Sequence, residues 1–309
     1  MINKNQAVLG LISLVVLASG CTQGGSTTEV TQTPNTGITI QQFSVFPSDV
    51  RPGGQTQLTL RIQNTGGATA SNVNATIYGL SWAGSGEGTA QQWGYDGQED
   101  TVAASGSNAD PVFNDFGNLR PPNPDAGIPS TSREKTLTIN APSRETGLST
   151  SQPILADLWF DYNTTSQAQI VLMRENQFQD QRPTRGRPSV QNSAGPIQVS
   201  IRTESPIILR GADGADDRSV CFVVNNVGTG TPYTDEGQNT VEITADVPNG
   251  DIVSDTVTLS QQTGQGGICA DNLGETVGNV RQEATVPITV ETEYSYKKST
   301  ESSISIDQS

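Results

Sequence analysis

Apolar and polar residues alternate with a period of two through most of the chain beyond residue 38. The alternating segments are short and are separated by Gly, Pro, Asn and Asp, with clear examples at 58–62, 73–77 and 156–162. This pattern is typical of β-strands that bury one face and expose the other. No stretch of comparable length keeps a helical period, so the pattern predicts an all-β protein.

The order of the alternating segments occurs twice along the chain. Apolar positions in 38–62 match those in 197–224. Apolar positions in 154–172 match those in 288–306 at a constant offset of 134 residues. Repetition of this kind predicts two copies of one β-domain.

Short strands with frequent turn signals suit a two-sheet sandwich. We therefore predict an all-β fold with two immunoglobulin-like β-sandwich domains in tandem, at 38–173 and 195–307. The segment 174–194, which contains arginines and prolines, is the predicted linker. Each domain is expected to end in a long strand, a hairpin and a short strand, with the hairpins between 162 and 170 and between 296 and 304.

A different pattern precedes the first domain. Residues 7–18 are uncharged and mostly apolar, too short a run for a membrane span but typical of a signal peptide. The next residues, Ser-Gly-Cys, end at Cys21 and resemble a lipobox. The resemblance implies that 1–20 is a lipoprotein signal peptide and that the Cys21 thiol carries lipid. The alternative is a plain secretory signal with an incidental cysteine.

Residues 21–37 are polar and cannot form a packed core, so they are predicted to be a flexible tether. Other apolar runs in the chain are too short to span a bilayer. We therefore expect the mature protein to be extracellular and anchored by its lipid to the outer face of the cytoplasmic membrane.

The charge balance excludes several classes of chemistry. The chain has 32 acidic and 17 basic residues, no histidine and a formal charge of −15. Without histidine there is no Ser-His-Asp nucleophile and no His-ligated metal. The net negative charge argues against nucleic acid, because phosphate binding needs a basic face. The excess of acids, with only four lysines, resembles the protein composition of salt-loving archaea. An ordinary acidic secreted protein is the alternative.

One segment carries a family resemblance. Residues 53–80 (GGQTQLTLRIQNTGGATASNVNATIYGL) resemble the CARDB-type, immunoglobulin-like modules of prokaryotic surface proteins, and 226–230 repeat their Asn-x-Gly signature more loosely. The resemblance implies a binding or spacer module without catalytic residues or cofactors. We therefore expect a lipid-anchored surface protein for adhesion, envelope structure or partner binding. Its partner would be another surface protein or a glycan, and we expect no enzyme activity.

Two cysteines remain besides Cys21, and an even pair in an exported protein predicts a disulfide between Cys221 and Cys269. Cys221 lies between the inward-facing Val220 and Phe222, so its side chain is expected on the outer face of the sheet. Cys269 lies in the glycine-rich segment 264–270, which we interpret as a loop. The disulfide would then fasten this loop over the outside of the sheet. Two free thiols are the alternative.

The region 81–132 has no counterpart of that length in the second half and contains several aromatic residues. Trp82, Trp93 and Tyr95 are candidate ligand-binding residues, because flat aromatic rings on long loops commonly stack on sugars. On this alternative reading of function, the chain is the glycan- or ligand-recognition subunit of a surface complex. The other interpretation is that these aromatics form a small core that holds the loop to the sheet.

Two further kinds of site are suggested by local residue patterns. Asp213, Asp216 and Asp217 are candidate calcium ligands, although a chain this acidic forms such clusters by chance. Asn74 and Asn163 each begin an Asn-x-Thr sequence and are candidate glycosylation sites. Both asparagines are expected to be exposed, Asn74 on the polar face of its strand and Asn163 at the start of a predicted hairpin turn.

Overall fold

The computed structural model describes the chain over residues 37–96, 101–103, 110–143, 149–210, 219–246, 253–270, 280 and 282–307. The signal peptide 1–20, Cys21, most of the tether and the calcium candidates Asp213, Asp216 and Asp217 lie outside these stretches. Within them, the chain forms β-strands and one helix, α1 (Glu175–Gln181), which confirms the all-β prediction. No helix of the described stretches is long and apolar enough to cross a membrane.

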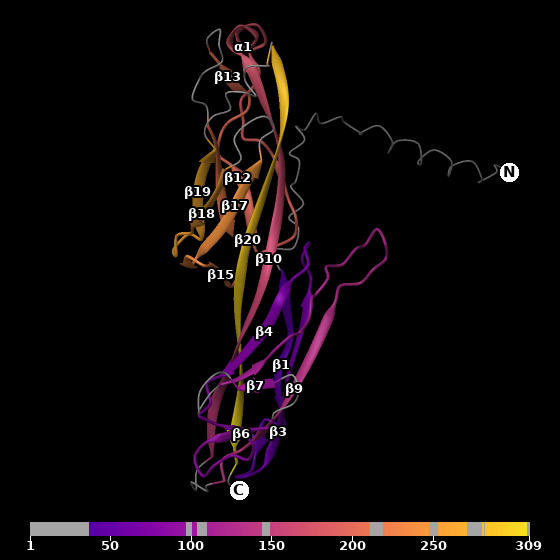
Figure 1. Ribbon diagram of the computed structural model, residues 1–309, viewed down its shortest axis with the longest axis vertical. Coiled ribbons are helices and arrows are strands. Elements are labelled where there is room, and N and C mark those ends of the chain that lie inside the picture. Colours follow the sequence, from indigo (N-terminus) through magenta and orange to yellow (C-terminus); the bar gives the residue numbers. More distant parts are fainter. Residues whose placement is uncertain are drawn as a thin grey trace, which may run out of the picture. The chain divides into compact units, whose positions relative to one another are not determined.

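Two very long strands form the centre of the fold (Figure 1). Strands β10 (Thr150–Arg174) and β20 (Glu283–Ile306) pair antiparallel without a break over 24 consecutive residue pairs. We call this pair of strands the ribbon. The even-numbered residues of β10 from 154 to 172 are buried, except for Ala168, and they form the inward face of the ribbon. The alternation that predicted these strands therefore also sets which face is buried.

The predicted hairpins between 162 and 170 and between 296 and 304 are wrong, because each segment continues its strand. The polar residues there are compatible with a buried strand. Thr164 and Thr292 are register partners that are 1% and 0% exposed. The hydroxyl of Thr164 lies 2.9 Å from that of Tyr294, and that of Thr292 donates to the Thr164 carbonyl at 3.3 Å. Threonines whose hydroxyl groups are hydrogen-bonded can therefore replace apolar residues at buried positions without interrupting the strand.

The repeat in the sequence takes an unexpected form in the ribbon. Asp161 and Ser295 are counterparts at the offset of 134, and they are also register partners. The matching segments of the two halves therefore pair with each other, related by a local two-fold axis through this residue pair. Each long strand begins among the strands of one half of the chain and ends among those of the other (Figure 1).

The ribbon is the middle of a twelve-stranded sheet. Strand β4 (Ser71–Tyr78) pairs with the first part of β10, and β17 (Thr240–Asp246) pairs with the first part of β20. Strand β15 (Thr231–Thr234) follows β17 along β20. The remaining strands are β2 (Asp49–Val50), β7 (Thr101–Ala103), β8 (Pro111–Phe113), β11 (Val190–Asn192), β13 (Ile207–Leu209), β16 (Gly237–Gln238) and β18 (Val253–Thr258).

Two smaller sheets complete the fold and share one order of strands. In the first half, β1 (Ile38–Phe46), β3 (Gln55–Asn64) and β9 (Ser132–Asn140) are followed by β6 (Trp93–Tyr95) and β5 (Trp82–Ser85). In the second half, β12 (Ile197–Ile201), β14 (Val220–Asn226) and β19 (Gln265–Ala270) form the corresponding three strands. Buried apolar side chains from all three sheets belong to one hydrophobic cluster.

The Asn-x-Gly signature builds the same turn in both halves. The Asn64 side chain accepts from the Gly66 N–H at 3.0 Å and donates to the Ala68 carbonyl at 2.8 Å. The Ala68 N–H in turn donates to the Tyr162 hydroxyl at 3.0 Å. The second turn makes the same three contacts at 3.1, 2.9 and 2.9 Å through Asn226, Gly228, Gly230 and Tyr296. In both halves, the signature therefore attaches the turn to a tyrosine of the ribbon.

Cys221 and Cys269 form a disulfide, as predicted. Cys221 lies between inward-facing residues, which agrees with its predicted place on the outer face. The interpretation of 264–270 as a loop is wrong, because Gln265–Ala270 is strand β19 and Cys269 is the register partner of Cys221. Glycine belongs in this strand for a steric reason. A Cβ on Gly266 would lie only 2.6 Å from the carbonyl oxygen of Thr258.

Candidate functional site

A cavity lies on the outward face of the ribbon, around its local two-fold axis. We call it the central groove, and its volume is about 800 Å3. The odd-numbered residues of the ribbon point to this face, because successive side chains of a strand alternate between faces. Its lining includes Trp159, Asp161 and Asn163 from β10 and Glu293 and Ser295 from β20.

Asp161 is held in place at the bottom of the central groove. Its carboxylate accepts a hydrogen bond from the Ser295 hydroxyl at 2.5 Å and another from the Asn72 side chain at 2.5 Å. Asn72 has a φ of 51°, a left-handed conformation that asparagine tolerates better than most residues. The pairing of β4 with β10 shifts register between Trp159 and Asp161. This β-bulge therefore brings the Asn72 amide to the Asp161 carboxylate.

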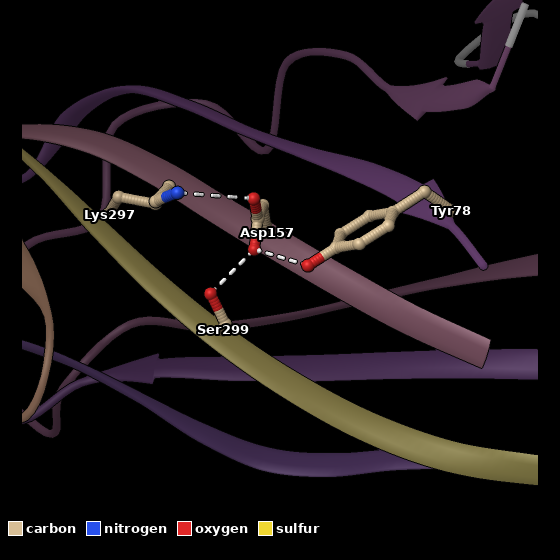
Figure 2. Close-up of polar contacts among 4 residues, drawn as sticks. All are labelled: Tyr78, Asp157, Lys297 and Ser299. Atoms are coloured by element: carbon tan, nitrogen blue, oxygen red, sulfur yellow. Dashed lines mark hydrogen bonds and ion pairs between the residues drawn. The ribbon is translucent and has the colours of Figure 1, made fainter. Parts of the chain in front are cut away.

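A second carboxylate, that of Asp157, lies on the same face of β10, four residues before Asp161. Figure 2 shows its polar contacts. Asp157 accepts hydrogen bonds from the Ser299 hydroxyl at 2.6 Å and the Tyr78 hydroxyl at 3.2 Å. Its other oxygen lies 3.5 Å from the Lys297 ammonium. Burial, followed by the nearby Asp157 charge, raises the pKa of Tyr78. Burial lowers the pKa of Lys297, but Asp157 and Tyr233 outweigh that effect and leave it raised.

Aromatic rings and carboxylates form the walls of the central groove. The rings of Trp159 and Tyr233 lie 4.9 Å apart, and the Lys297 ammonium lies 5.5 Å from the Trp159 ring. Glu242 and Glu293 are exposed and directly opposite each other on β17 and β20. Like charges in this arrangement repel. Among the described residues, Lys297 stands beside the groove at the Trp159 ring, and the groove lining itself contains no lysine or arginine.

Two buried tyrosines of the ribbon also contribute to the lining of the groove. Tyr162 and Tyr294 line it, and their rings lie 6.3 Å apart. Burial raises the pKa of Tyr162 and, more strongly, that of Tyr294. Burial also raises the pKa of the neighbouring Tyr296 to about 12. These phenols are therefore protonated at physiological pH and serve as hydrogen-bonding groups rather than as bases.

The aromatic candidates from the sequence lie elsewhere, inside the first half of the fold. Trp82, Trp93 and Tyr95 are 2%, 1% and 0% exposed. The rings of Trp82 and Tyr95 meet edge to face at 5.7 Å, and the Trp93 indole N–H donates to Gln152 at 3.0 Å. Within the described residues, these side chains pack together and offer no open face for stacking on a sugar. Their burial favours the small core over the ligand-binding interpretation.

Both candidate glycosylation residues lie on the outward face of the twelve-stranded sheet. Asn163 is exposed and lines the central groove. Asn74 is half-buried in β4, and its amide donates to the Asn72 carbonyl at 3.0 Å. Neither site lies in a turn. Sequence reasoning missed Trp159 and Tyr233, although Trp159 does stand at a polar-face position of its alternating strand.

No protein-family model and no curated protein matches this sequence. The red sea bream transglutaminase structure is similar with a TM-score of 0.20 and 8% identity, over 89% of this chain and 32% of that one. A hypothetical protein from Parabacteroides merdae is similar with a TM-score of 0.17 and 13% identity, over 77% of this chain and 52% of that one. This chain thus spans about a third and about half of their lengths.

Two bacterial surface proteins are also weakly similar to this chain. The collagen adhesin (CNA) from S. aureus gives a TM-score of 0.12 and 10% identity, over 84% of this chain and 80% of that one. The C-terminal domain of the Streptococcus agalactiae AgI/II polypeptide BspA has a TM-score of 0.17 and 7% identity, over 84% of this chain and 93% of that one. Likenesses at these scores carry no argument about fold or function.

Proposed function

We propose that this chain is a lipid-anchored extracellular protein that holds a partner at the cell surface and does not turn over a substrate. In this proposal its two halves are immunoglobulin-like β-sandwich domains that exchange their long final strands. Its role is adhesion or envelope structure. The partner is another surface protein, which presents lysine or arginine side chains to the central groove.

The central groove is the observation that carries this proposal. It combines half-buried aromatic rings with the opposed carboxylates of Glu242 and Glu293. Cationic side chains are attracted both to the faces of aromatic rings and to carboxylates. A basic partner would also relieve the repulsion between the two glutamates. This gain would be available only in the complex, and it therefore favours binding.

The ribbon supports a mechanical role. Its 24 residue pairs connect the strands of one half of the chain to those of the other through continuous backbone hydrogen bonding. Pulling the halves apart along the strands would require these bonds to break together rather than one after another. A surface protein under tension benefits from such a connection. The alternative role, ligand recognition by Trp82, Trp93 and Tyr95, gains no support from their burial.

An attachment assay tests the proposed function. Cells that lack the chain would be complemented with the natural protein, with Glu242→Gln plus Glu293→Gln, or with Trp159→Ala. We expect the natural chain to restore attachment to neighbouring cells and the groove variants to restore less. Thr285→Ala is the matched control, because it changes an exposed residue of β20 that does not line the groove. Unchanged attachment in cells without the chain would refute the role.

The proposed anchor is tested separately. A Cys21→Ser variant would be expressed beside the natural chain, and both would be labelled with a radioactive lipid precursor. We expect label in the natural chain alone and release of the variant into the medium. Equal release of the two chains would refute lipid anchoring and would leave the binding role to be judged from the attachment assay with purified, immobilised protein.

A further inference from the structure

A second pocket lies on the outer face of the sheet formed by β12, β14 and β19. Its volume is about 440 Å3. Ser200 of β12 and Val223 of β14 are register partners on this face, and Asn225 and Gln265 form the next row. At the other end of the pocket stands Arg202, whose N–H donates to the Cys221 carbonyl at 2.8 Å. The pocket therefore lies beside the disulfide.

The remaining wall comes from the chain before β11, with Arg187 and Pro188. This segment is fixed by two backbone hydrogen bonds between Gly186 and Ser205, at 2.9 and 2.8 Å. The pocket is thus bordered by two arginines from segments that are each held by backbone contacts. Both arginine side chains are exposed, so neither contributes to the buried core.

The described contacts of these two arginines differ from those of their neighbours. Nearby, Arg185 lies 3.4 Å from Glu204, and Arg210 lies 3.5 Å from Glu175. Among the described residues, neither Arg187 nor Arg202 makes an ion pair, and the pocket lining contains no Asp or Glu. The part of the chain that the structure describes thus places two arginines and no carboxylate around this pocket, although the whole chain has a formal charge of −15.

The chemistry of the lining indicates what would bind. A guanidinium group presents N–H donors in a planar fork that matches the two oxygens of a carboxylate or sulfate. Ser200, Asn225 and Gln265 add hydroxyl and amide groups that pair with ring hydroxyls. Between them, Val223 offers an apolar surface, and its register partner Gly267 has no side chain to obstruct it. Together these groups suit an acidic sugar better than a free ion.

We propose that this pocket binds an acidic carbohydrate, with Arg187 and Arg202 holding its carboxylate or sulfate group. Ser200, Asn225 and Gln265 then recognise the sugar hydroxyls. The proposal does not depend on the central groove, which has the opposite charge and lies on the ribbon. A surface protein with both sites would hold a basic partner at one site and an acidic glycan at the other.

Calorimetric titration of the full chain at low ionic strength tests the proposal. The probes are an oligogalacturonate, a sulfated oligosaccharide, a neutral oligosaccharide of equal length and inorganic sulfate. We expect one of the two acidic sugars to bind more tightly than the neutral sugar and the free ion. In Arg187→Gln plus Arg202→Gln, that affinity should fall by at least about fivefold, because hydrogen bonds to a charged group are lost.

Arg133→Gln is the matched control, since it removes one exposed arginine of β9 far along the chain from the pocket. It should change the affinity by less than about twofold, because surface charges at a distance are screened. Equal thermal unfolding of all variants would show that each is folded. The proposal fails if neither acidic sugar binds, if the double variant loses less than fivefold, or if free sulfate binds as tightly as the sugar.

Discussion

In each Asn-x-Gly turn, one glycine packs against one tyrosine of the ribbon. A Cβ on Gly66 would lie well inside the contact distance of the Tyr162 hydroxyl oxygen, and a Cβ on Gly228 would do the same at Tyr296. Glycine is required at both positions because the tyrosine hydroxyl lies too close to leave room for a Cβ, and not because the backbone has a positive φ. The tyrosine hydroxyl then accepts the hydrogen bond that holds the turn.

We predict that Gly66→Ala and Gly228→Ala each lower the free energy of unfolding by about 2 kcal/mol, because overpacking displaces a buried tyrosine. Chemical denaturation measures this change. Gly186→Ala is the control, because a Cβ there would meet no atom within 4 Å. A loss at Gly186 as large as those at the other two glycines would contradict the steric explanation.

The buried tyrosines also predict how stability depends on pH. Burial raises the pKa of Tyr296 to about 12 and that of Tyr294 further, so the folded state favours their neutral forms. Their contribution is complete below the ordinary tyrosine pKa of about 10 and is lost as pH rises through the folded value. Unfolding free energy should therefore fall above about pH 10. Ultraviolet titration that shows every tyrosine ionising near pH 10 in folded protein would contradict this.

Residue-level prediction from the sequence succeeded where one local rule decides the outcome. The alternation placed Val220 and Phe222 inward and therefore Cys221 outward. It did not identify Trp159 and Tyr233 as neighbours, because their contact depends on β15 joining the ribbon. Nothing in the local pattern around Tyr233 indicates that pairing.

Among the elements, the disulfide is the covalent link between β14 and β19. Replacing both cysteines by serine should lower the free energy of unfolding by up to about 4 kcal/mol, since the link closes a loop of 48 residues in the unfolded chain. Chemical denaturation of the oxidised natural chain and the double variant gives the difference. Free thiols in the native protein, or equal stability of the two forms, would contradict the prediction.

The ribbon shows why element boundaries were harder to predict than element type. Apolar residues become sparse between 162 and 170, and this local pattern predicts a turn. Thr164 is nevertheless buried there, because Tyr294 and Thr292 satisfy its polar atoms. The partner segment lies about 130 residues away, so the local sequence alone does not reveal that satisfaction. The pairing of this segment with β20 thus keeps it in a strand, although its local sequence favours a turn.

At the scale of the whole molecule, the two halves depend on each other through the exchanged strands. The first part of β10 pairs with β4, while its last part pairs with β11 and β13. A fragment limited to 38–173 would lack β20, the partner of β10 along its whole length. We predict that this fragment is largely unfolded, as measured by circular dichroism. A fragment with native-like cooperative unfolding would contradict the interdependence.

Hydrogen exchange along β10 and β20 tests the central claim of an unbroken ribbon most directly. The hydrogen-bonded amides between Ile154 and Leu172, and those between Val286 and Ile304, should exchange slowly and with similar opening free energies, because they open only with the whole unit. Rapid exchange confined to the amides between Tyr162 and Ile170 would show a turn there. That result would restore two separately closed domains and contradict the shared ribbon.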